Sequence, residues 1–485
     1  MTKRIRTFSL LILAFILIIS TALLLGGKPT LQGANNTIPA EISDADFGRM
    51  ISDFSEPNGT YPYENYVSNE PSVQYVIPAL RKITKPGGVY LGVAPEQNFT
   101  YIYALQPKIA FIMDIRRQNM LELLMYKTLF ELSPNRADFV ARLFSRKRPA
   151  GLDDRTSVSA LFAAFDSAPK EDVGQNLAEL RSALAKHGYG LSSDDLASIE
   201  FVYQVFYRGG PSIDYEFMSS TPAPVLVNYK QEMAGTDPEG KSWSFLSSEE
   251  AYHYIREMER KNLIVPLVAD FSGPKTMRRI SQYLKERNST VTAFYLSNVE
   301  MYLEGPKMRN FQENVATLPM ESSSTLIRWM PSNVTQYLSW YTPSIGPMAT
   351  GLQSMNEFVD LLKAGRSPTT WPDAVRGTKD PNTLAQSAQD PSLRKVAGRV
   401  IGVTGLKANE FIAVELVENV RGSGIIFHTE AGADGSFEFH NVQPRTYQAI
   451  VLKTCKSCQL STGMGTAVPV VVGNSDVTNL QLTVR

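Results

Sequence analysis

The 485-residue sequence contains only two cysteines and four histidines. Two cysteines cannot form the dense disulfide network of a small secreted scaffold, and four histidines limit any histidine-rich metal site. The motifs H-E-x-x-H and G-x-S-x-G are missing, and so is a multi-cysteine zinc pattern. The sequence therefore carries no signature of a zinc protease or of a serine hydrolase.

An excess of either charge is also missing, because 48 lysine and arginine residues balance 48 aspartate and glutamate residues. Nucleic-acid-binding proteins normally show a basic excess or a basic face, so we expect no nucleic-acid partner. Hydrophobic residues make up 43% of the chain and charged residues 20%, as in ordinary globular proteins. The length exceeds what one hydrophobic core usually supports, which predicts at least two domains.

A long uncharged stretch occupies residues 8–27 and follows Lys3, Arg4 and Arg6. As a helix, its apolar part would span roughly 27 Å, close to the thickness of a bilayer core. The positive-inside rule then keeps residues 1–7 in the cytoplasm and exports the rest. We expect a single-pass inner-membrane protein with an extracytoplasmic bulk. The alternative is a cleaved signal peptide, whose apolar core usually has only 7–15 residues.

Composition divides the remaining chain into four parts. Residues 28–60 are polar and predict a spacer, and residues 61–363 alternate between strand-like and helix-like patterns, which predicts an α/β domain. Residues 364–395 contain four prolines among small polar residues and predict a linker. Residues 396–485 show short alternating strands with turn residues between them and predict a small all-β domain.

Within the α/β part, short apolar runs are separated by helical patterns. Such runs are typical of a parallel sheet that is buried on both faces. We expect strands at residues 89–94, 108–115, 263–271, 291–296 and 324–330, and helices at residues 72–83, 120–132 and 275–287. In open sheets of this kind, ligands bind beyond the carboxyl ends of the strands, where the strand order reverses.

Two residues at predicted strand ends suggest a nucleotide-type site. Gly92 could let a ligand approach the backbone, and Asp114 follows it by 22 residues, at the end of the next strand. That spacing is typical of an acid that binds ribose hydroxyls, although a complete G-x-G-x-x-G motif is missing. Alternatively, Asp114 caps the helix that begins near Arg116. Asp270, at a later strand end, could reach the cleft or cap the helix that follows it, and capping is the preferred interpretation.

These features resemble the Rossmann-like fold of S-adenosylmethionine-dependent methyltransferases, and more closely a bacterial family of that fold known from a Leptospira hypothetical protein. The likeness covers roughly residues 60–330. It is carried by residues 63–70 (YENYVSNE), 88–99, 111–119 (FIMDIRRQN) and 292–300 (TAFYLSNVE).

The resemblance implies S-adenosylmethionine as a possible cofactor and assigns its contacts. Gly92 and Glu96 would bind the amino-acid end, and Asp114 the ribose. The remaining residues that would face the cleft are Asn65, Asn69, Asn298 and Glu300. The sequence departs from the methyltransferase pattern after the first strand, where residues 93–95 (VAP) replace the expected glycines. Since the donor is a cytoplasmic metabolite, an exported domain implies a reversed orientation, another ligand or lost catalysis.

The C-terminal part resembles the carboxypeptidase regulatory-like domain, a prealbumin-like β-sandwich also grouped with carbohydrate-binding folds. The resemblance is carried by residues 429–439 (TEAGADGSFEF), in which Asp434-Gly435 predicts a hairpin turn and Phe437 and Phe439 should enter the core. It implies a structural or binding module without peptidase residues. Cys455 and Cys458 form a C-x-x-C pair, for which a local disulfide is favoured over a metal site.

Two functions remain open at this point. The first is a membrane-anchored protein whose methyltransferase-like Rossmann domain is an enzyme or a descendant without activity. The second is a non-enzymatic envelope protein that binds a glycan or a protein partner through its β-sandwich. The cleft around Gly92, Glu96 and Asp114 distinguishes the two hypotheses.

Overall fold

The computed structural model describes residues 37–222, 225–331, 349–389, 394–404, 406, 410–418, 426–432, 434–455 and 462–484. The predicted membrane helix at residues 8–27 lies outside these ranges, and so does Cys458 of the predicted disulfide. Among the described residues, no helix is long and apolar enough to cross a membrane.

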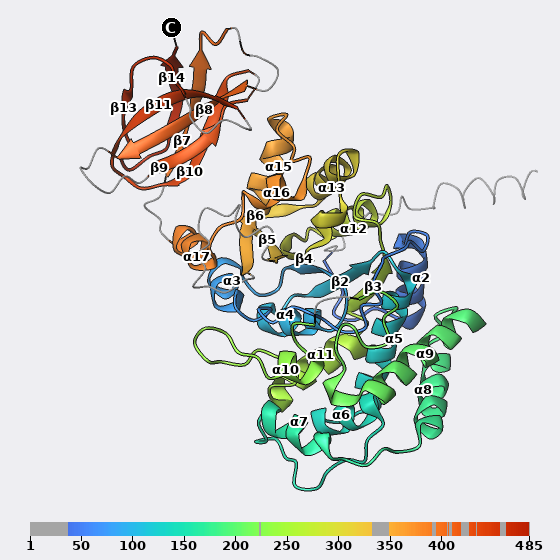
Figure 1. Cartoon of the computed structure of the whole chain (residues 1–485). Coiled ribbons are helices and arrows are strands. Elements are labelled where there is room, and N and C mark those ends of the chain that lie inside the picture. The colour runs from blue at the N-terminus through green and yellow to red at the C-terminus, as the bar shows by residue number, and fades with distance from the viewer. Residues whose placement is uncertain are drawn as a thin grey trace, which may run out of the picture.

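A six-stranded sheet forms the centre of the α/β domain (Figure 1). Its spatial order is β3-β2-β1-β4-β5-β6, and β6 alone runs antiparallel to its neighbour. The strands are β1 (Val89–Val93), β2 (Ile109–Asp114), β3 (Ile264–Val268), β4 (Val291–Ser297), β5 (Met320–Met330) and β6 (Ala349–Ser354). Every residue of β1, β2 and β3 is buried, which explains their uninterrupted apolar runs. The predicted parallel strands are confirmed, and the sequence analysis missed only β6.

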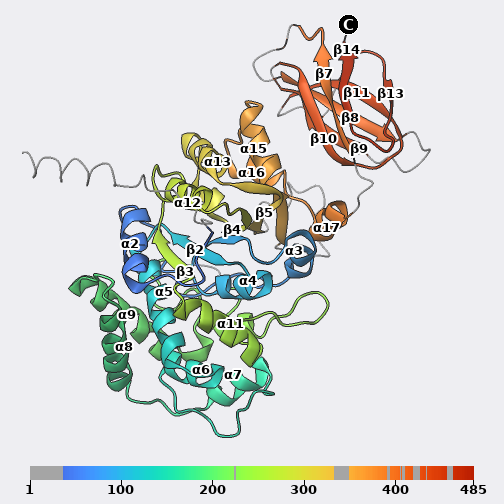
Figure 2. The same ribbon diagram turned by 180° about the vertical axis from the view of Figure 1, so that it is seen from behind.

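Helices cover both faces of this sheet, as Figures 1 and 2 show from opposite sides. One layer contains α3 (Ile77–Ile83), α4 (Gln97–Leu105), α5 (Arg117–Leu132) and α11 (Glu249–Arg260). The other contains α2 (Asp44–Phe54), α12 (Thr276–Lys285), α13 (Pro306–Thr317) and α15 (Met355–Lys363). This is a doubly wound arrangement. β1 lies between β2 and β4, at the point where the order of strands across the sheet reverses.

A helical insertion separates β2 from β3 and packs against α5. It contains α6 (Arg136–Phe144), α7 (Val158–Asp166), α8 (Val173–His187), α9 (Ser193–Gly209) and α10 (Tyr229–Met233). The sequence analysis expected alternating strands and helices here and did not foresee this insertion. Aromatic stacking joins the insertion to α5. The ring centroids of Phe130 of α5 and Phe139 of α6 are 4.5 Å apart.

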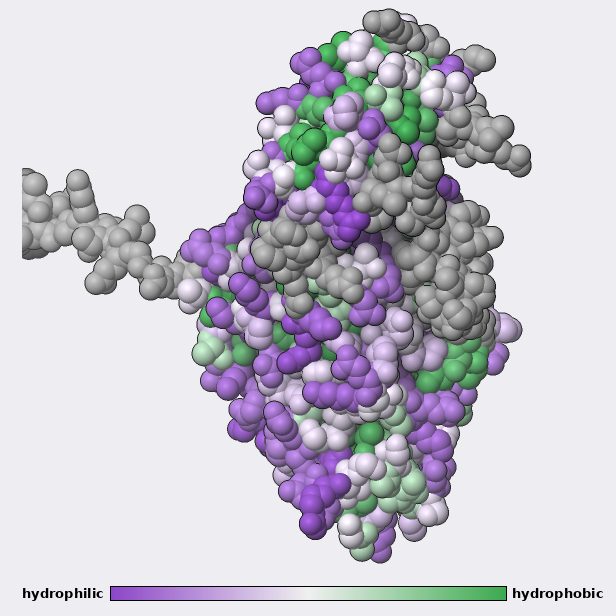
Figure 3. All heavy atoms as spheres, turned by 90° about the vertical axis from the view of Figure 1, so that its left-hand side faces the viewer, coloured by the Kyte–Doolittle hydropathy of each residue, from purple (hydrophilic) through white to green (hydrophobic). Residues whose placement is uncertain are grey.

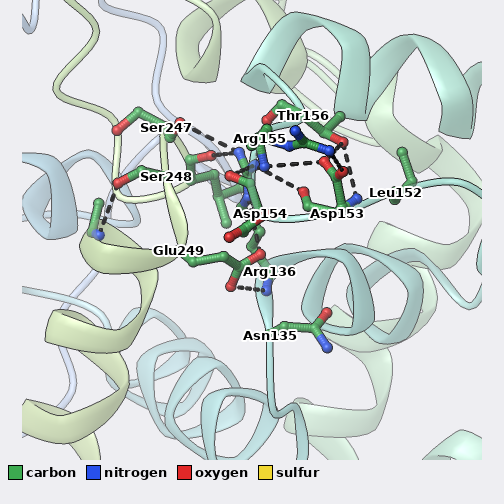
Figure 4. Close-up of polar contacts among 12 residues, drawn as sticks. Asn135, Arg136, Leu152, Asp153, Asp154, Arg155, Thr156, Ser247, Ser248 and Glu249 are labelled. Carbon is green, nitrogen blue, oxygen red and sulfur yellow. Dashed lines mark hydrogen bonds and ion pairs between the residues drawn. The ribbon is translucent and has the colours of Figure 1, made fainter.

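Arg136 ties the insertion to the start of α11 (Figure 4). Its side chain is 1% exposed, and its Nε lies 3.1 Å from Oε1 of Glu249. The same guanidinium donates to the backbone carbonyls of Leu246 and Asp154, at 3.1 and 3.2 Å. Five donors in one rigid fork let a single buried arginine satisfy carbonyls from separate segments.

The predicted spacer at residues 28–60 is corrected in its second half. Ser43 caps α2 by accepting the N–H of Asp46 at 3.1 Å, and Phe47, Met50 and Ile51 of this helix are buried in the main core. Residues 44–54 have a polar average composition because α2 buries only one apolar stripe and exposes its other faces to solvent.

The predicted linker at residues 364–395 is corrected as well. It contains α16 (Trp371–Val375) and α17 (Pro381–Gln389), and α17 packs against α3. Trp371, Val375 and Leu384 are buried against the α/β domain. Pro372 and Pro381 stand in the first turn of these helices, where proline is well tolerated, so the prolines mark helix starts.

The C-terminal region contains two β-sheets around a core of its own. One sheet has the order β10-β7-β14, and the other has the order β12-β11-β8-β9 with β13 also on β11. The strands are β7 (Arg394–Ile401), β8 (Glu410–Glu418), β9 (Ile426–Glu430), β10 (Ser436–Val442), β11 (Thr446–Cys455), β12 (Thr462–Gly463), β13 (Val468–Val471) and β14 (Val477–Thr483). The predicted all-β region is confirmed, and Phe437 and Phe439 enter its core as expected.

The predicted hairpin at Asp434-Gly435 is different in the structure. The turn joins β9 to β10, but these strands lie in separate sheets and do not pair with each other. Gly435 has φ +80°, which glycine adopts without strain. A turn signal shows that the chain reverses, whereas the partner of each strand depends on the core that the two sheets share.

Candidate functional site

A cavity of about 660 Å³ opens at the carboxyl ends of the parallel strands. Its lining includes Ala94 after β1, Asp114 at the end of β2 and Ser297 at the end of β4. Because β1 is flanked by β2 and β4, the cavity lies where the strand order reverses. This is the location that the sequence analysis expected for a ligand.

Four residues of the predicted site line this cavity: Asn65, Asn69, Asp114 and Asn298. They come from the segment before α3 and from the ends of β2 and β4, so the fold brings together residues that are far apart in sequence. The side chain of Asn69 accepts the N–H of Leu226 at 2.9 Å and thereby ties the rim to the helical insertion. Their role in binding a cofactor stays a prediction.

The other three predicted residues do not line the cavity. Gly92 makes room for Asn98, since a Cβ at Gly92 would lie 1.9 Å from the side-chain oxygen of Asn98. Glu96 is fully buried beside α4, where it accepts the N–H of Ser68 at 3.1 Å. Glu300 forms an ion pair with Arg328, and both side chains are 1% exposed.

Asp114 takes part in a local turn and also lines the cavity, and its role in binding ribose stays a prediction. Its Oδ1 accepts the N–H of Arg116, the residue before α5, at 2.8 Å, so it does stabilise the turn into the helix. The same side chain lines the cavity. Burial raises the pKa of Asp114, and the nearby Arg116 guanidinium opposes that shift. A carboxyl held in this way can accept hydrogen bonds from a ligand's hydroxyl groups.

Asp270 also lines the cavity, but it does not cap α12. Its Oδ1 accepts the N–H and the hydroxyl of Ser272, which closes a local turn. Glu56 takes the capping position, because its carboxylate accepts the N–H groups of Lys275 and Thr276 at 2.8 and 3.1 Å. The preferred reading of Asp270 as a helix cap is therefore wrong.

Tyr61, Tyr63, Tyr215 and Tyr302 form an aromatic wall of the cavity, which the sequence analysis missed. The ring centroids of Tyr61 and Tyr302 are 5.2 Å apart, and those of Tyr63 and Tyr215 are 5.9 Å apart. The hydroxyl of Tyr61 lies 3.1 Å from that of Tyr302 and 3.4 Å from that of Tyr215. Burial raises the pKa of Tyr215 to about 12, so this phenol stays neutral.

Glu70 is a second lining residue without an assigned role in the sequence analysis. Its two carboxylate oxygens accept hydrogen bonds from the hydroxyls of Tyr295 and Ser297, both on β4. The side chain is 6% exposed, and burial raises the pKa of Glu70 to about 7. The only sequence signal for a role of Glu70 was its position in residues 63–70, one of the runs that carry the family resemblance.

Three residues that line the cavity have a strained backbone conformation. Asn65, Ala94 and Ser297 have φ values of 56°, 64° and 50°, and all three line the cavity. Residues with a side chain rarely adopt this left-handed conformation, and such residues cluster at functional sites. The strain supports a functional reading of this cavity independently of its location in the sheet.

Apart from the tyrosines, the ionisable side chains of the lining are three carboxyl groups, Glu70, Asp114 and Asp270, and one lysine, Lys307. Among the residues that the structure describes, no group of three or more histidine, cysteine, aspartate or glutamate side chains is arranged to hold a metal ion. The aromatic wall and the carboxyl groups suit an organic ligand with a ring and a positive charge.

A family model described as "Domain of unknown function (DUF7790)" matches residues 65–380. The matched range contains all six strands of the sheet and reaches into the corrected linker region, up to the residue before α17. A search of curated proteins finds no match to the chain.

Proposed function

Because the chain belongs to the family described as Domain of unknown function (DUF7790), whose description names no activity, we propose a function from the cavity itself. We propose that the cavity binds a nucleoside ligand without phosphate groups, and that S-adenosylmethionine is this ligand. The chain is then a methyltransferase, or a methyltransferase-like binding protein.

The location of Asp114 carries this proposal. It ends β2, the neighbour of β1, and its carboxyl group lines the cavity at the reversal point of the sheet. Nucleotide-binding sheets of this topology place an acid there to accept hydrogen bonds from ribose hydroxyls. Ribose is common to all adenosine cofactors, so a second observation has to select among them.

The first turn of α4 argues against a ligand with phosphates. Dinucleotides bind their pyrophosphate at the N-terminus of the helix that follows the first strand, through free backbone N–H groups. In this chain Pro95 has no N–H, and Glu96 places a buried carboxyl group at that helix end. Burial raises the pKa of Glu96 to about 7, so about half of these carboxyl groups are ionised at pH 7 and would repel phosphate. S-adenosylmethionine contains adenosine but no phosphate.

The tyrosine wall supports the same ligand. Phenol rings stack on planar bases and attract cations over their faces, and a sulfonium group is such a cation. Tyr61, Tyr63, Tyr215 and Tyr302 line one cavity, and the Arg116 guanidinium over the ring of Tyr61, 5.7 Å from its centroid, shows that this wall accepts a cation. The lining carboxyl groups outnumber the single lysine, which favours a positively charged ligand further.

Calorimetry on the full-length protein tests the proposal. We expect S-adenosylmethionine and S-adenosylhomocysteine to bind and NAD and ADP to give no heat. Replacing Asp114 by Asn should weaken binding about tenfold or more, because a hydrogen bond to a charged group contributes about 1.5–3 kcal/mol. The control is Asp194→Asn, at an exposed position in the first turn of α9. Binding of NAD or ADP in place of the two adenosyl ligands would contradict the proposal.

We also propose that residues 8–27 tether the chain to the membrane. The compartment of the α/β domain then decides whether it can meet a cytoplasmic methyl donor. Protease added to intact cells should digest the domain if it is extracytoplasmic, as the positive-inside rule predicts. In that case the cavity serves another ring-bearing cation or lacks catalysis, whereas a protected domain supports methyl transfer.

A second candidate is the non-enzymatic binding protein, and surface hydrophobicity favours a protein partner for it. Ile401, Leu406 and Val471 of the C-terminal region are exposed, Val471 to 71%, and Figure 3 shows hydrophobic surface on this region. By contrast, three aromatic side chains of this region, Phe437, Phe439 and Tyr447, are buried in the core and cannot stack on a sugar, and Phe411 and Phe427 are half-buried. Pull-down of one envelope protein by wild type and not by Val471→Asp would support this function.

A further inference from the structure

Glu70 reaches the cavity from the segment that precedes α3, and β4 holds it there. The hydroxyl of Tyr295 donates to Oε2 of Glu70, and the hydroxyl of Ser297 donates to Oε1. Among the described residues, Glu70 forms no ion pair. A buried carboxyl group with hydroxyl donors but no cation lacks the partner that normally compensates such a charge.

The two donors are themselves fixed in position. Ser297 has φ +50°, a strained conformation for a serine, and this places its hydroxyl on Glu70. Tyr295 receives a hydrogen bond from the side chain of Gln97 at 3.4 Å, and its ring lies 5.1 Å from that of Tyr101. The carboxyl group therefore occupies one defined position at the cavity wall.

We propose that Glu70 is the proton-exchanging and charge-selecting group of the cavity: it carries a proton in the empty site and releases it when a cationic ligand enters. The inference rests on the proposed function. It adds that the site distinguishes a sulfonium or quaternary ammonium ligand from the neutral analogue of that ligand. The proton leaves the Glu70 carboxyl for solvent, and the resulting carboxylate faces the ligand's cation.

The titratable side chains that face Glu70 are not part of the cavity lining. The groups facing it are Tyr90 of β1, Tyr101 of α4, Tyr295 of β4 and Glu232 of α10. Burial raises the pKa of each of them well above its ordinary value, which favours the neutral form of all four. None of the four lines the cavity.

Calorimetry at pH 7 in two buffers with different ionisation enthalpies measures the protons released on binding. Burial raises the pKa of Glu70 to about 7, so we expect release of about half a proton per S-adenosylmethionine bound. S-adenosylhomocysteine lacks the sulfonium charge and should release close to none. In Glu70→Gln the release should vanish, and S-adenosylmethionine should bind about tenfold more weakly.

The matched control is Glu259→Gln. Glu259 is another buried glutamate, and burial raises its pKa to about 8, but it lies on α11 and does not line the cavity. This variant should release protons as the wild type does. Equal proton release by wild type and Glu70→Gln would overturn the inference.

Ser297→Ala separates charge selection from a merely structural role. Loss of the Ser297 hydroxyl removes a hydrogen bond that lowers the pKa of Glu70, so the proton is held more tightly. We expect more proton release and weaker S-adenosylmethionine binding at pH 7, with wild-type affinity restored at pH 8.5. A loss of affinity that is the same at both pH values would contradict the proposal.

The proposed function and this inference fail in different ways. If neither adenosyl ligand binds, the proposed function fails, and tetramethylammonium becomes the probe because it carries the charge without the nucleoside. It should then raise the unfolding temperature of wild type more at pH 8 than at pH 6, and that of Glu70→Gln equally at both. An equal effect on both proteins would overturn the role of Glu70.

Discussion

Buried ionisable residues near the cavity are of two kinds, those with an ionic partner and those without. Glu300 belongs to the first kind, since Arg328 donates to both of its oxygens and also to the side chain of Gln353. Glu70 belongs to the second kind, with hydroxyl donors alone. The Glu300–Arg328 ion pair holds β5 against the segment that follows β4. Glu70, without an ionic partner, leaves its carboxyl group for a ligand.

We expect Glu300→Gln to destabilise the protein without weakening ligand binding. Removing the Glu300 charge leaves the buried Arg328 without an ionic partner, which lowers the free energy of unfolding by about 3 kcal/mol or more. Urea unfolding measures the loss, and calorimetry with S-adenosylmethionine measures affinity. The control is Glu313→Gln, which breaks the exposed pair with Arg309 and should change stability by less than about 1 kcal/mol. Intact stability with lost affinity would instead place Glu300 at the ligand.

The candidate site was only partly predictable at this scale. Asp114 follows an apolar run directly, so its place at a strand end is encoded locally. Tyr61, Tyr215 and Tyr302 lie in three distant segments, and a tyrosine has no local pattern that separates a cavity wall from a core position. Glu300 lies just after a strand end, as a ligand-binding acid would, and only its contact with Arg328 reveals its structural role.

At the scale of elements, His187 joins three helices at the side of the α/β domain. It ends α8, and its ring nitrogens contact Asp44 of α2 at 2.9 Å and Glu131 of α5 at 2.7 Å. The hydrogen bond to Glu131, followed by that to Asp44, raises the pKa of His187 against the effect of burial. Burial opposes ionisation of both carboxyl groups, but their hydrogen bonds with His187 and other donors lower the pKa of each.

We expect this contact to stabilise the protein in a window around pH 6. The raised pKa of His187 means that its contribution is fully present below its ordinary value of about 6.5 and is lost as pH rises through the folded value. The lowered pKa values of Asp44 and Glu131 mean that their contribution is lost as pH falls through their folded values.

Urea unfolding of wild type and His187→Gln across pH 4 to 9 tests this expectation. Wild type should be more stable by about 1 kcal/mol near pH 6, because the Asp44 side chain is 45% exposed and its charge is partly screened. The difference should shrink toward pH 9. His253→Gln, on the exposed face of α11, is the control and should show little change. A difference that is independent of pH would show that His187 acts by packing alone.

The parallel strands and three of the flanking helices, α3, α5 and α12, followed from local pattern, whereas the other flanking helices and the insertion did not. Fully buried strands such as β1 and β2 are uniform apolar runs bounded by turn residues, and these can be read directly. The insertion contains helices with buried apolar residues, of which α6, α8 and α9 pack against α5. A stripe shows that a helix packs on something, but it does not show that several helices in a row share one partner.

At the scale of the whole molecule, the chain divides into two units with separate hydrophobic cores. The main core extends from Ile38 to Ala385, and the C-terminal core extends from Val396 to Val484. No buried residue of either core cluster belongs to the other. Each unit therefore has the core that independent folding requires.

We expect truncation after Gln389 to leave the stability of the α/β unit nearly unchanged. Truncation after Lys363, at the predicted start of the linker, removes α16 and α17. The loss exposes the surface that Trp371, Val375 and Leu384 cover, which costs about 5 kcal/mol in total. Thermal unfolding of the two truncated chains measures the difference. Equal unfolding temperatures would restore the predicted linker boundary.

The sequence by itself determined what depends on neighbours along the chain. It specified the apolar strands, the alternating C-terminal strands, Phe437 and Phe439 in a core, and an acid at the end of β2. Only the tertiary structure decided which distant residues meet, because the burial of a side chain depends on every element packed around it. It placed Glu70 and four tyrosines at one cavity, turned Glu300 into half of an ion pair, and joined residues 364–389 to the folded unit.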